Sequence, residues 1–196
     1  PVLGTIRPRS STDHVKRLDL DRYRSVVHGG IRRESVLVIG AGIAGSHAAR
    51  ILHDHGHPVT VLDKSRGPGG RSSSRRGDGT RHDHGCQVLR LRGPALQRLS
   101  ESWEEDGVIA RWNPRILRNG SVLPRPREPW FVGTPGMNEL VRHLQRDLPV
   151  EFGRRVTRLE KATTGWLAFD EADSKLGEAD RVIVAAPAPQ AADLLR

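Results

Sequence analysis

Hydrophobic residues are unevenly distributed along this chain, and the first regular pattern begins at Ser35. Residues 35–39 form a short apolar run rich in β-branched side chains, and residues 58–63 form a second one. Such runs are typical of parallel strands that are buried on both faces. Between them, small and apolar residues recur at helical spacing over 45–55, and Gly56 is a natural residue just past a helix end. The pattern predicts a strand–helix–strand unit, which is nearly always a right-handed crossover.

The middle of the chain, residues 94–148, has a mixed pattern. Residues 96–103 and 137–148 are predicted helices, and the second of them carries an apolar stripe at helical spacing. Residues 116–123 are predicted to form a hairpin, because Asn119-Gly120 suits the two turn positions that need a positive φ.

The last part of the chain returns to strand patterns. Residues 149–152, 155–160 and 166–169 are predicted as three antiparallel strands with polar turns between them. Another buried run follows at 181–186, and a helix is predicted to start at Ala188.

Residues 1–34 differ from the rest of the chain. They are polar and basic and show no sustained apolar stripe. A segment of this composition cannot bury enough apolar surface to offset the entropy of ordering, so we expect a disordered N-terminal arm.

Composition and charge narrow the class of protein. The 196 residues carry a formal net charge of +9, and 36% of them are hydrophobic. No apolar run approaches the ~20 residues that a membrane-spanning helix needs. The basic excess favours anionic ligands such as phosphates, nucleotides or nucleic acid. The single cysteine, Cys86, excludes an internal disulfide and a multi-cysteine metal site, which suits a reducing cytoplasm.

A glycine motif lies between the first predicted strand and helix. Residues 40–45 read G-x-G-x-x-G: Gly40 permits a tight turn, Gly42 lets a pyrophosphate approach the backbone, and Gly45 lets the helix pack on the strands. The helix N-terminus then offers free N–H groups and a positive dipole end. Asp63 ends the second strand at about the spacing at which an acid accepts hydrogen bonds from an adenosine ribose. Together these features predict a dinucleotide site.

The residues after Asp63 distinguish between the possible dinucleotides. Residues 64–74 form a basic, glycine-rich loop in a place where a simple NAD domain would continue into another helix. Gly69 and Gly70 allow close approach of the backbone, and Arg71 can pair with a phosphate oxygen. The loop therefore favours FAD over NAD.

The two glycine segments, residues 40–45 and 69–74, together resemble the two-part fingerprint of a large FAD-dependent superfamily that contains amine oxidases, phytoene desaturases and renalase. The resemblance is closest to renalase and its bacterial relatives. Asp83-His84-Gly85-Cys86-Gln87 resembles their Asp-x-Gly-Ala-Gln segment, and residues 133–137 resemble their Gly-x-Pro-Gly-Met helix opening. Residues 182–190 resemble their late strand-to-helix turn.

This resemblance implies an α/β fold: a Rossmann-like FAD-binding domain, with a parallel sheet and an antiparallel three-stranded piece, and part of an α+β substrate domain. The arm would occupy residues 1–34, the FAD-binding domain residues 35–93 and 149–196, and the substrate domain residues 94–148. Family enzymes continue well beyond this length. Because the chain also lacks an initiator Met and stops inside a predicted helix, we expect a fragment whose C-terminal part is missing.

The resemblance also implies roles for individual residues. The first glycine loop would line the pyrophosphate, Asp63 would bind the ribose, and Arg71 would lie on the phosphates. Gly85 to Gln87 would run near the flavin ring, and Val156 would offer backbone groups to the adenine. The expected cofactor-binding residues are Gly40, Gly42, Ile43, Ala44, Gly45, Asp63, Lys64, Gly70, Arg71, Cys86, Gln87 and Val156.

The implied activity is transfer of a hydride from a small reduced substrate, a dihydronicotinamide or an amine, to the flavin and then to oxygen or another acceptor. Cys86 replaces a usual alanine, and Val88-Leu89 stand where relatives often have aromatic residues. These departures leave the substrate undefined. The sequence also does not define the catalytic residues, the electron acceptor or the oligomeric state.

Three alternatives remain open. The chain could be an NAD-binding regulatory domain, an inactive partial chain, or a nucleic-acid-binding module built on its basic segments. The shortage of aromatic residues in the basic loop argues against nucleic acid, and no membrane partner is expected. No metal site is expected either, because His53, His55 and His57 alternate at a helix end and do not converge as ligands spaced i, i+4 would.

Overall fold

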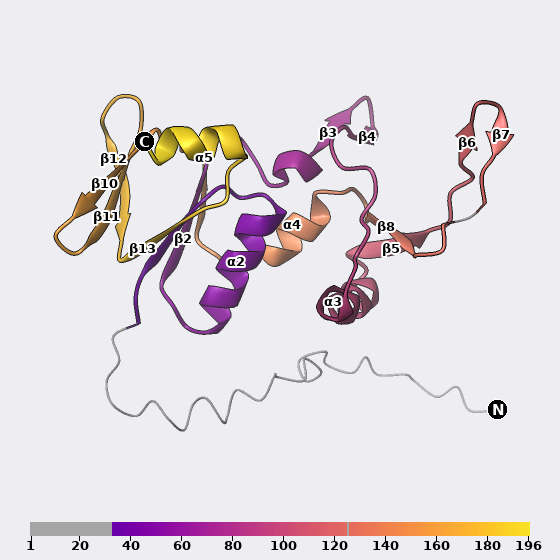
Figure 1. Ribbon diagram of the computed structural model, residues 1–196, viewed down its shortest axis with the longest axis horizontal. Coiled ribbons are helices and arrows are strands. Elements are labelled where there is room, and N and C mark those ends of the chain that lie inside the picture. The colour runs from indigo at the N-terminus through magenta and orange to yellow at the C-terminus, as the bar shows by residue number, and fades with distance from the viewer. Residues whose placement is uncertain (1–32, 125) are drawn as a thin grey trace, which may run out of the picture. The chain divides into compact units, whose positions relative to one another are not determined.

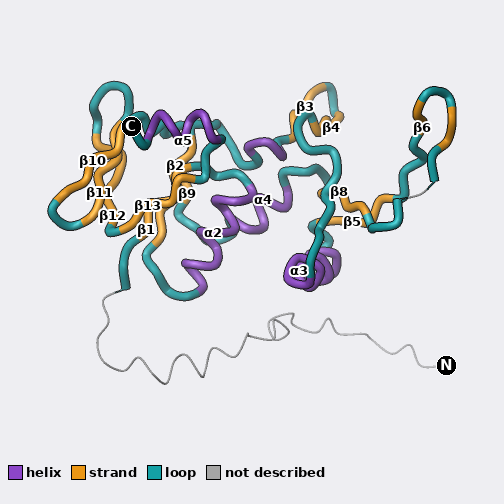
Figure 2. Tube along the Cα trace, viewed as in Figure 1, coloured by secondary structure: helices purple, strands orange, loops and turns teal. Residues whose placement is uncertain are grey.

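The computed structural model describes residues 33–124 and 126–196. They include a four-stranded sheet with the strand order β13–β1–β2–β9, in which every neighbouring pair is parallel (Figure 1 and Figure 2). The strands are β1 (Val36–Ile39), β2 (Val59–Asp63), β9 (Val150–Phe152) and β13 (Arg181–Val184). All four residues of β1 are buried, as the uninterrupted apolar run predicts.

Helix α2 (Ile43–Asp54) connects β1 to β2 and covers one face of this sheet. Ala49 of α2 packs with Val36 and Val38 of β1 and with Val61 of β2 in one buried cluster. Gly56 follows the helix with φ +78°, a backbone conformation that a glycine adopts without strain. The predicted strand–helix–strand unit is confirmed.

A three-stranded antiparallel sheet covers the opposite face. It consists of β10 (Arg158–Ala162), β11 (Gly165–Phe169) and β12 (Lys175–Ala179), in that order. Ala168 and Ala179 pack against Leu37 and Ile39, the β1 residues whose side chains point away from α2. The parallel sheet is thus enclosed between a helical layer and a second sheet, and the predicted α/β architecture is confirmed.

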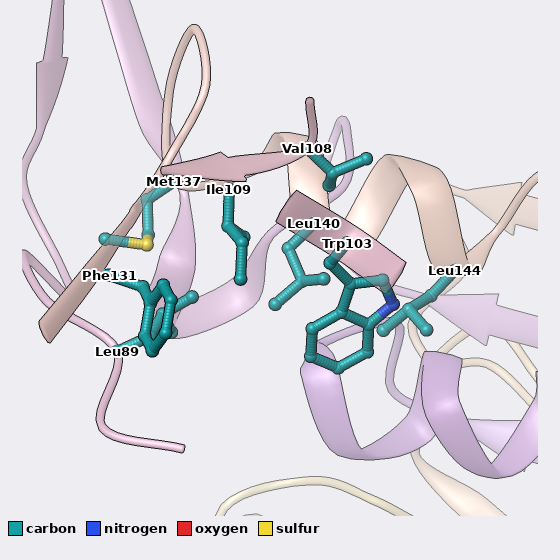
Figure 3. Close-up of a cluster of buried hydrophobic side chains, with 8 residues drawn as sticks. All are labelled: Leu89, Trp103, Val108, Ile109, Phe131, Met137, Leu140 and Leu144. Carbon is teal, nitrogen blue, oxygen red and sulfur yellow. The ribbon is translucent and has the colours of Figure 1, made fainter. Parts of the chain in front are cut away.

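The middle of the chain has a hydrophobic cluster of its own. It is built on α3 (Pro94–Glu105), on α4 (Glu139–Leu144), and on β5 (Ile109–Trp112), which pairs antiparallel with β8 (Trp130–Gly133). Figure 3 shows its side chains, with Leu140 lying between Ile109 and Trp103. The cluster comprises Leu89, Trp103, Val108, Ile109, Phe131, Met137, Leu140 and Leu144.

Shorter elements complete the described part of the chain (Figure 2). A single 3₁₀ turn, η1 (Gly70–Ser72), precedes the hairpin of β3 (Ser74–Gly77) and β4 (Thr80–Asp83). A second hairpin pairs β6 (Leu117–Arg118) with β7 (Ser121–Val122). Its turn residues Asn119 and Gly120 have φ values of +50° and +78°, which confirms the predicted turn. Helix α5 (Ala188–Leu194) follows β13, also as predicted.

Several strand predictions at the C-terminal side were wrong. Residues 149–152 were predicted to belong to the antiparallel sheet, but β9 pairs in parallel with β2. The strand predicted over 155–160 begins only at Arg158, as β10, and the third strand of the observed sheet is β12, which the pattern did not predict. Side-chain periodicity defines which face a strand buries but not the direction of its partner. The sequence of β12, KLGEA, is also too polar to stand out as a strand.

Helix lengths and the middle strands also differ from the prediction. Helix α4 ends at Leu144, although its apolar stripe continues to Leu148, because residues 145–147 form turns. Strands β5 and β8 and the hairpin of β3 and β4 were not predicted from the sequence. The expected disorder of the arm concerns residues 1–34, of which all but Arg33 and Glu34 lie outside the described residues. None of the described helices is long and apolar enough to cross a membrane.

Candidate functional site

The carboxyl ends of β1 and β2 lie at the same edge of the parallel sheet, where the first glycine loop begins. The Gly40 amide donates to the carbonyl of Leu62 (N···O 2.8 Å). The next amide, that of Ala41, donates to the side chain of Asp63 (N···Oδ2 2.6 Å). Loop and acid are therefore held together by direct hydrogen bonds, at the edge where ligands of open α/β sheets bind.

The two glycine segments meet backbone to backbone. Gly42 and Gly69 form a parallel β-bridge, although they are far apart in the sequence. A Cβ built on Gly70 would lie 3.3 Å from the Cα of Gly42, closer than side chains usually pack. A glycine at position 70 suits this close approach, and the two loops present backbone side by side at the bridge.

Two glycines of the first loop have different steric surroundings. A Cβ on Gly45 would lie 1.9 Å from the carbonyl oxygen of Gly40, so no side chain fits there. A Cβ on Gly42 would meet no atom within 4 Å, and Gly42 has an unstrained φ of −78°. Gly45 is thus required by the packing of α2, whereas the space beside Gly42 is open to a ligand.

A cavity of about 770 Å³ opens at this edge of the sheet. Nine of the twelve residues expected to bind a cofactor line it: Gly40, Gly42, Ile43, Ala44, Asp63, Lys64, Gly70, Arg71 and Val156. Gly45 lies behind the loop instead, where it contacts Gly40. Cys86 and Gln87 do not line the cavity, but Cys86 is connected to it because its amide donates to the carbonyl of Arg71 (N···O 2.7 Å).

The cavity wall is cationic. Lys64, Arg71, Arg154 and Arg155 line it, against Asp63 and Asp193. Arg154 pairs with Glu151 (Nε···Oε2 3.1 Å), whereas the other three cations form no ion pair with a residue in the described ranges. Such cations stabilise a bound anion, and Arg71 lies beside the glycine bridge where a diphosphate would sit.

The carboxylate of Asp63 already accepts three hydrogen bonds. Besides the Ala41 amide, it accepts hydrogen bonds from the amide of Ser65 (N···Oδ1 2.6 Å) and from the Ser65 hydroxyl. A carboxylate offers roughly four lone-pair sites. Asp63 thus holds the loop in place and retains one acceptor position for a ligand hydroxyl, fewer than the several ribose hydrogen bonds that the sequence suggested.

Apart from Val156, sequence reasoning missed two walls of this cavity. Residues 154–157, between β9 and β10, lie close to Asp63 and line the cavity, because the Arg154 amide donates to the carbonyl of Asp63 (N···O 2.9 Å). The other wall comes from residues 185–187 at the end of β13 and from Gln190, Asp193 and Leu194 of α5. One signal was available: the apolar run at 181–186 is typical of a buried parallel strand, and the carboxyl ends of parallel strands lie at one edge of the sheet, here the edge of Gly40.

The described residues contain no group of three or more histidine, cysteine, aspartate or glutamate side chains that could hold a metal ion. His55 and His57 instead direct their Nδ1 atoms to backbone carbonyls, those of Ile51 (2.7 Å) and Glu34 (3.0 Å).

The donor set and the shape of this site fit FAD. Open space beside Gly42, free cations and a single remaining acceptor on Asp63 suit a diphosphate followed by a ribose. Residues 38–105 match a family model described as an NAD(P)-binding Rossmann-like domain, and residues 107–196 match one described as flavin containing amine oxidoreductase. Residues 107–196 are thus similar to the flavin-containing amine oxidoreductases. The combined matches indicate FAD as the cofactor.

Curated relatives agree with this relationship. An L-amino-acid oxidase from Daboia russelii is 36% identical over 62 residues, which are 30% of this chain and 12% of that protein. A phytoene desaturase from Fusarium fujikuroi is 44% identical over 79 residues, 39% of this chain and 14% of that protein. Both are redox enzymes by name, and the matches span only a small share of their length.

Solved structures share the fold. A CLA-producing fatty acid isomerase from P. acnes superimposes with a TM-score of 0.63 at 15% identity, over 83% of this chain and 61% of that one. The tetracycline destructase Tet(51) superimposes with a TM-score of 0.53 at 18% identity, over 79% of this chain and 39% of that one. At such identities the likeness concerns the fold alone.

Proposed function

We propose that this protein is an FAD-dependent oxidoreductase of the amine oxidase and renalase type. It would take a hydride from a small reduced substrate, an amine or a dihydronicotinamide, and pass the electrons to oxygen or another acceptor. The observation that carries the proposal is the bridge between Gly42 and Gly69 beside Asp63, because it joins three elements of one diphosphate site around a single cavity.

Each residue would contribute through its own chemistry. The backbone at Gly40, Gly42, Ile43, Ala44 and Gly70 would contact the pyrophosphate at the start of α2, where free amides and the helix dipole favour anions. Gly45 would act indirectly, by letting α2 pack beneath the loop. Bound FAD would supply the hydride-accepting ring.

Side chains on the rest of the wall would orient the cofactor. Lys64 and Arg71 would neutralise the phosphates, and the remaining acceptor position of Asp63 would take a ribose hydroxyl. The backbone of Val156 would face the adenine. Cys86 and Gln87 would lie beside the flavin ring, which is supported by the hydrogen bond that ties Cys86 to Arg71.

The proposal also assigns the segments of the chain to two domains. Residues 35–93 and 149–196 would form the cofactor domain, and residues 94–148 would form part of a substrate domain. The separate cluster around Met137 and Leu140 supports this division. Resemblance of residues 83–87, 133–137 and 182–190 to renalase segments supports the closer relationship to renalase. The single cysteine, Cys86, fits a cytoplasmic location.

The visible absorption spectrum of the purified protein tests the cofactor. A yellow protein that releases FAD on denaturation is expected, and Arg71→Ala should lower the affinity for added FAD about 10- to 100-fold, the value of a charge-assisted hydrogen bond. Arg66→Ala, which changes a neighbouring cation outside the cavity lining, is the matched control. A colourless protein whose extract contains NAD would overturn the proposal in favour of an NAD-binding domain.

The substrate class is tested by anaerobic mixing of the yellow protein with amines and with dihydronicotinamides. Loss of the flavin absorbance with one class and its return on admission of oxygen would identify the electron donor and an acceptor. If neither class bleaches the flavin, the proposed substrate classes are wrong even though the cofactor assignment stands.

A further inference from the structure

The hairpin of β3 and β4 is tied to the turn that precedes α4 by a set of contacts that the proposed cofactor site does not use. Asp83, the last residue of β4, accepts a hydrogen bond from the amide of Met137 (N···Oδ1 3.0 Å). The same carboxylate oxygen accepts one from the hydroxyl of Ser74. The Ser74 oxygen in turn accepts a hydrogen bond from the amide of Asn138 (3.3 Å).

Two more contacts join the same elements. Arg81 of β4 forms an ion pair with Glu139 of α4 (Nη1···Oε1 2.9 Å), and both side chains are mostly buried. Gly136 lies so close to the hairpin that an added Cβ would be 3.0 Å from the Ser74 oxygen. We refer to Ser74, Asp83 and the backbone of residues 136–138 as the clamp.

The clamp lies next to the segment that leads back to the cavity. Gly85 follows Asp83 by two residues, and an added Cβ there would lie 2.1 Å from the carbonyl oxygen of Arg71. The next amide, that of Cys86, donates to this same carbonyl. Residues 84–86 are therefore held at both ends, by Asp83 at the clamp and by the backbone of Arg71 at the cavity.

We propose that Asp83 is a positioning residue. By fixing the turn at residues 136–138 it holds the Gly85–Gln87 segment against Arg71, and so couples the cofactor cavity to the middle of the chain. A carboxylate suits this role because one charged oxygen can accept from the Met137 amide and the Ser74 hydroxyl together. For the flavin, the inference rests on the proposed function, which places Cys86 and Gln87 beside the ring.

Amide hydrogen exchange tests the coupling without any need for the cofactor. In Asp83→Ala, we expect the amides of Met137 and Cys86 to exchange about 10- to 100-fold faster, the loss that corresponds to one charge-assisted hydrogen bond. Amides of β1 and β2, for example that of Val61, should be unchanged. Asp83→Asn should restore part of this protection, because the neutral side-chain amide oxygen still accepts from the Met137 amide.

Two further variants separate positioning from general stability. Glu139→Gln removes the charge of the neighbouring ion pair but leaves the clamp intact, so it should not alter exchange at Cys86. Ser74→Ala is the milder change to use if Asp83→Ala does not fold, and it should raise exchange at Met137 and Cys86 several-fold. Unchanged exchange at Cys86 in both Asp83→Ala and Ser74→Ala would overturn the proposal, as would equal acceleration in β1 and β2.

The same variants in the flavin-loaded protein extend the test to the ring. Visible circular dichroism of bound FAD reports the surroundings of the flavin, and it should change in Asp83→Ala but not in Glu139→Gln. Altered exchange at Cys86 with an unchanged flavin signal would overturn the role toward the cofactor. If the purified wild-type protein is colourless and its extract contains NAD, the proposed function fails, and hydrogen exchange alone then decides whether Asp83 couples the two segments.

Discussion

The junction between Gly42 and Gly69 and the junction between Asp83 and Met137 each join segments that are distant in the sequence, but they do so by opposite means. At the first, backbone meets backbone because side chains are absent. At the second, a carboxylate reaches across to amides of another segment. The comparison shows that a site can depend as much on positions where no atom is tolerated as on positions where a charge is required.

The two junctions also differ in how much change they should tolerate. Around the first glycine loop the closest atoms are backbone atoms, which cannot move without shifting β1 or α2. Around the turn at Gly136 the closest atoms belong to the side chains of Arg81 and Ser74. A side chain can rotate away from an intruding atom, so the same substitution should cost less there.

The largest effect is expected for Gly45→Ala. The added methyl group would lie 1.9 Å from the Gly40 carbonyl oxygen, and α2 would have to move away from β1. The helix gains up to about 1 kcal/mol from replacing glycine, but overpacking against backbone should outweigh this gain and lower the free energy of unfolding by about 3 kcal/mol. Chemical denaturation measures this loss. If Gly45→Ala were as stable as the wild type, the loop would have to pack differently.

Gly42→Ala should separate binding from folding. No atom lies within 4 Å of the added methyl group, so the free energy of unfolding should change by no more than about 1 kcal/mol. The affinity for FAD should nevertheless fall by about tenfold or more, because the methyl group occupies the space beside the phosphates. Titration of the apoprotein with FAD measures this fall.

The matched control for that variant is Gly67→Ala. Gly67 lies in the second glycine-rich loop, residues 64–74; like Gly42 it has no neighbour within 4 Å of an added Cβ, but it does not line the cavity. Its substitution should leave the affinity for FAD unchanged. Equal losses at Gly42 and Gly67 would mean that the diphosphate does not lie beside Gly42.

Gly136→Ala tests the side-chain junction in the same way. The methyl group would meet the Cδ atom of Arg81 at 2.4 Å and the Ser74 oxygen at 3.0 Å. Because Arg81 can adopt another rotamer, we expect a loss of only about 1 kcal/mol in the free energy of unfolding. Chemical denaturation of Gly136→Ala and Gly45→Ala under the same conditions compares the two losses. A larger loss for Gly136→Ala than for Gly45→Ala would contradict this expectation.

The smallest effect concerns pH. Burial, with a contribution from the nearby Arg146, lowers the pKa of His143 on α4 below its ordinary value of 6.5. The unfolded chain therefore binds a proton at a pH where the folded chain does not, and the stability contributed by neutral His143 is lost as the pH falls below 6.5. His143→Gln should flatten the dependence of unfolding free energy on pH in this range. An unchanged slope would assign the dependence to other groups.

The cofactor edge of the fold could be predicted closely because its requirements are local. The apolar run before Gly40, the spacing of Gly40, Gly42 and Gly45, and the acid at Asp63 each follow from a short stretch of chain. A glycine at such a position indicates a steric requirement from the residue type alone. The predicted loop, helix and second strand therefore agree with the structure, and nine of the twelve expected residues line one cavity.

The remaining walls of the site could not be predicted to the same extent. Arg154 and Arg155 lie in a polar stretch that resembles any exposed loop, and Asp193 lies on a helix with no buried residue. Their place at the cavity depends on β9 joining the edge of β2 and on β13 joining the edge of β1. Strand order and direction are properties of pairing between distant segments, which periodicity does not encode.

By itself, the sequence determined the strand–helix–strand unit, the two glycine segments and the acid between them, because short-range sterics and helical or strand periodicity act within a few residues. Only the tertiary structure decided that β9 runs parallel to β2, that residues of α5 form a wall of the cavity, and that Asp83 holds the turn at Met137. The physical reason is that these contacts reach backbone groups, which nearly every residue carries, so no residue type marks the partner in advance.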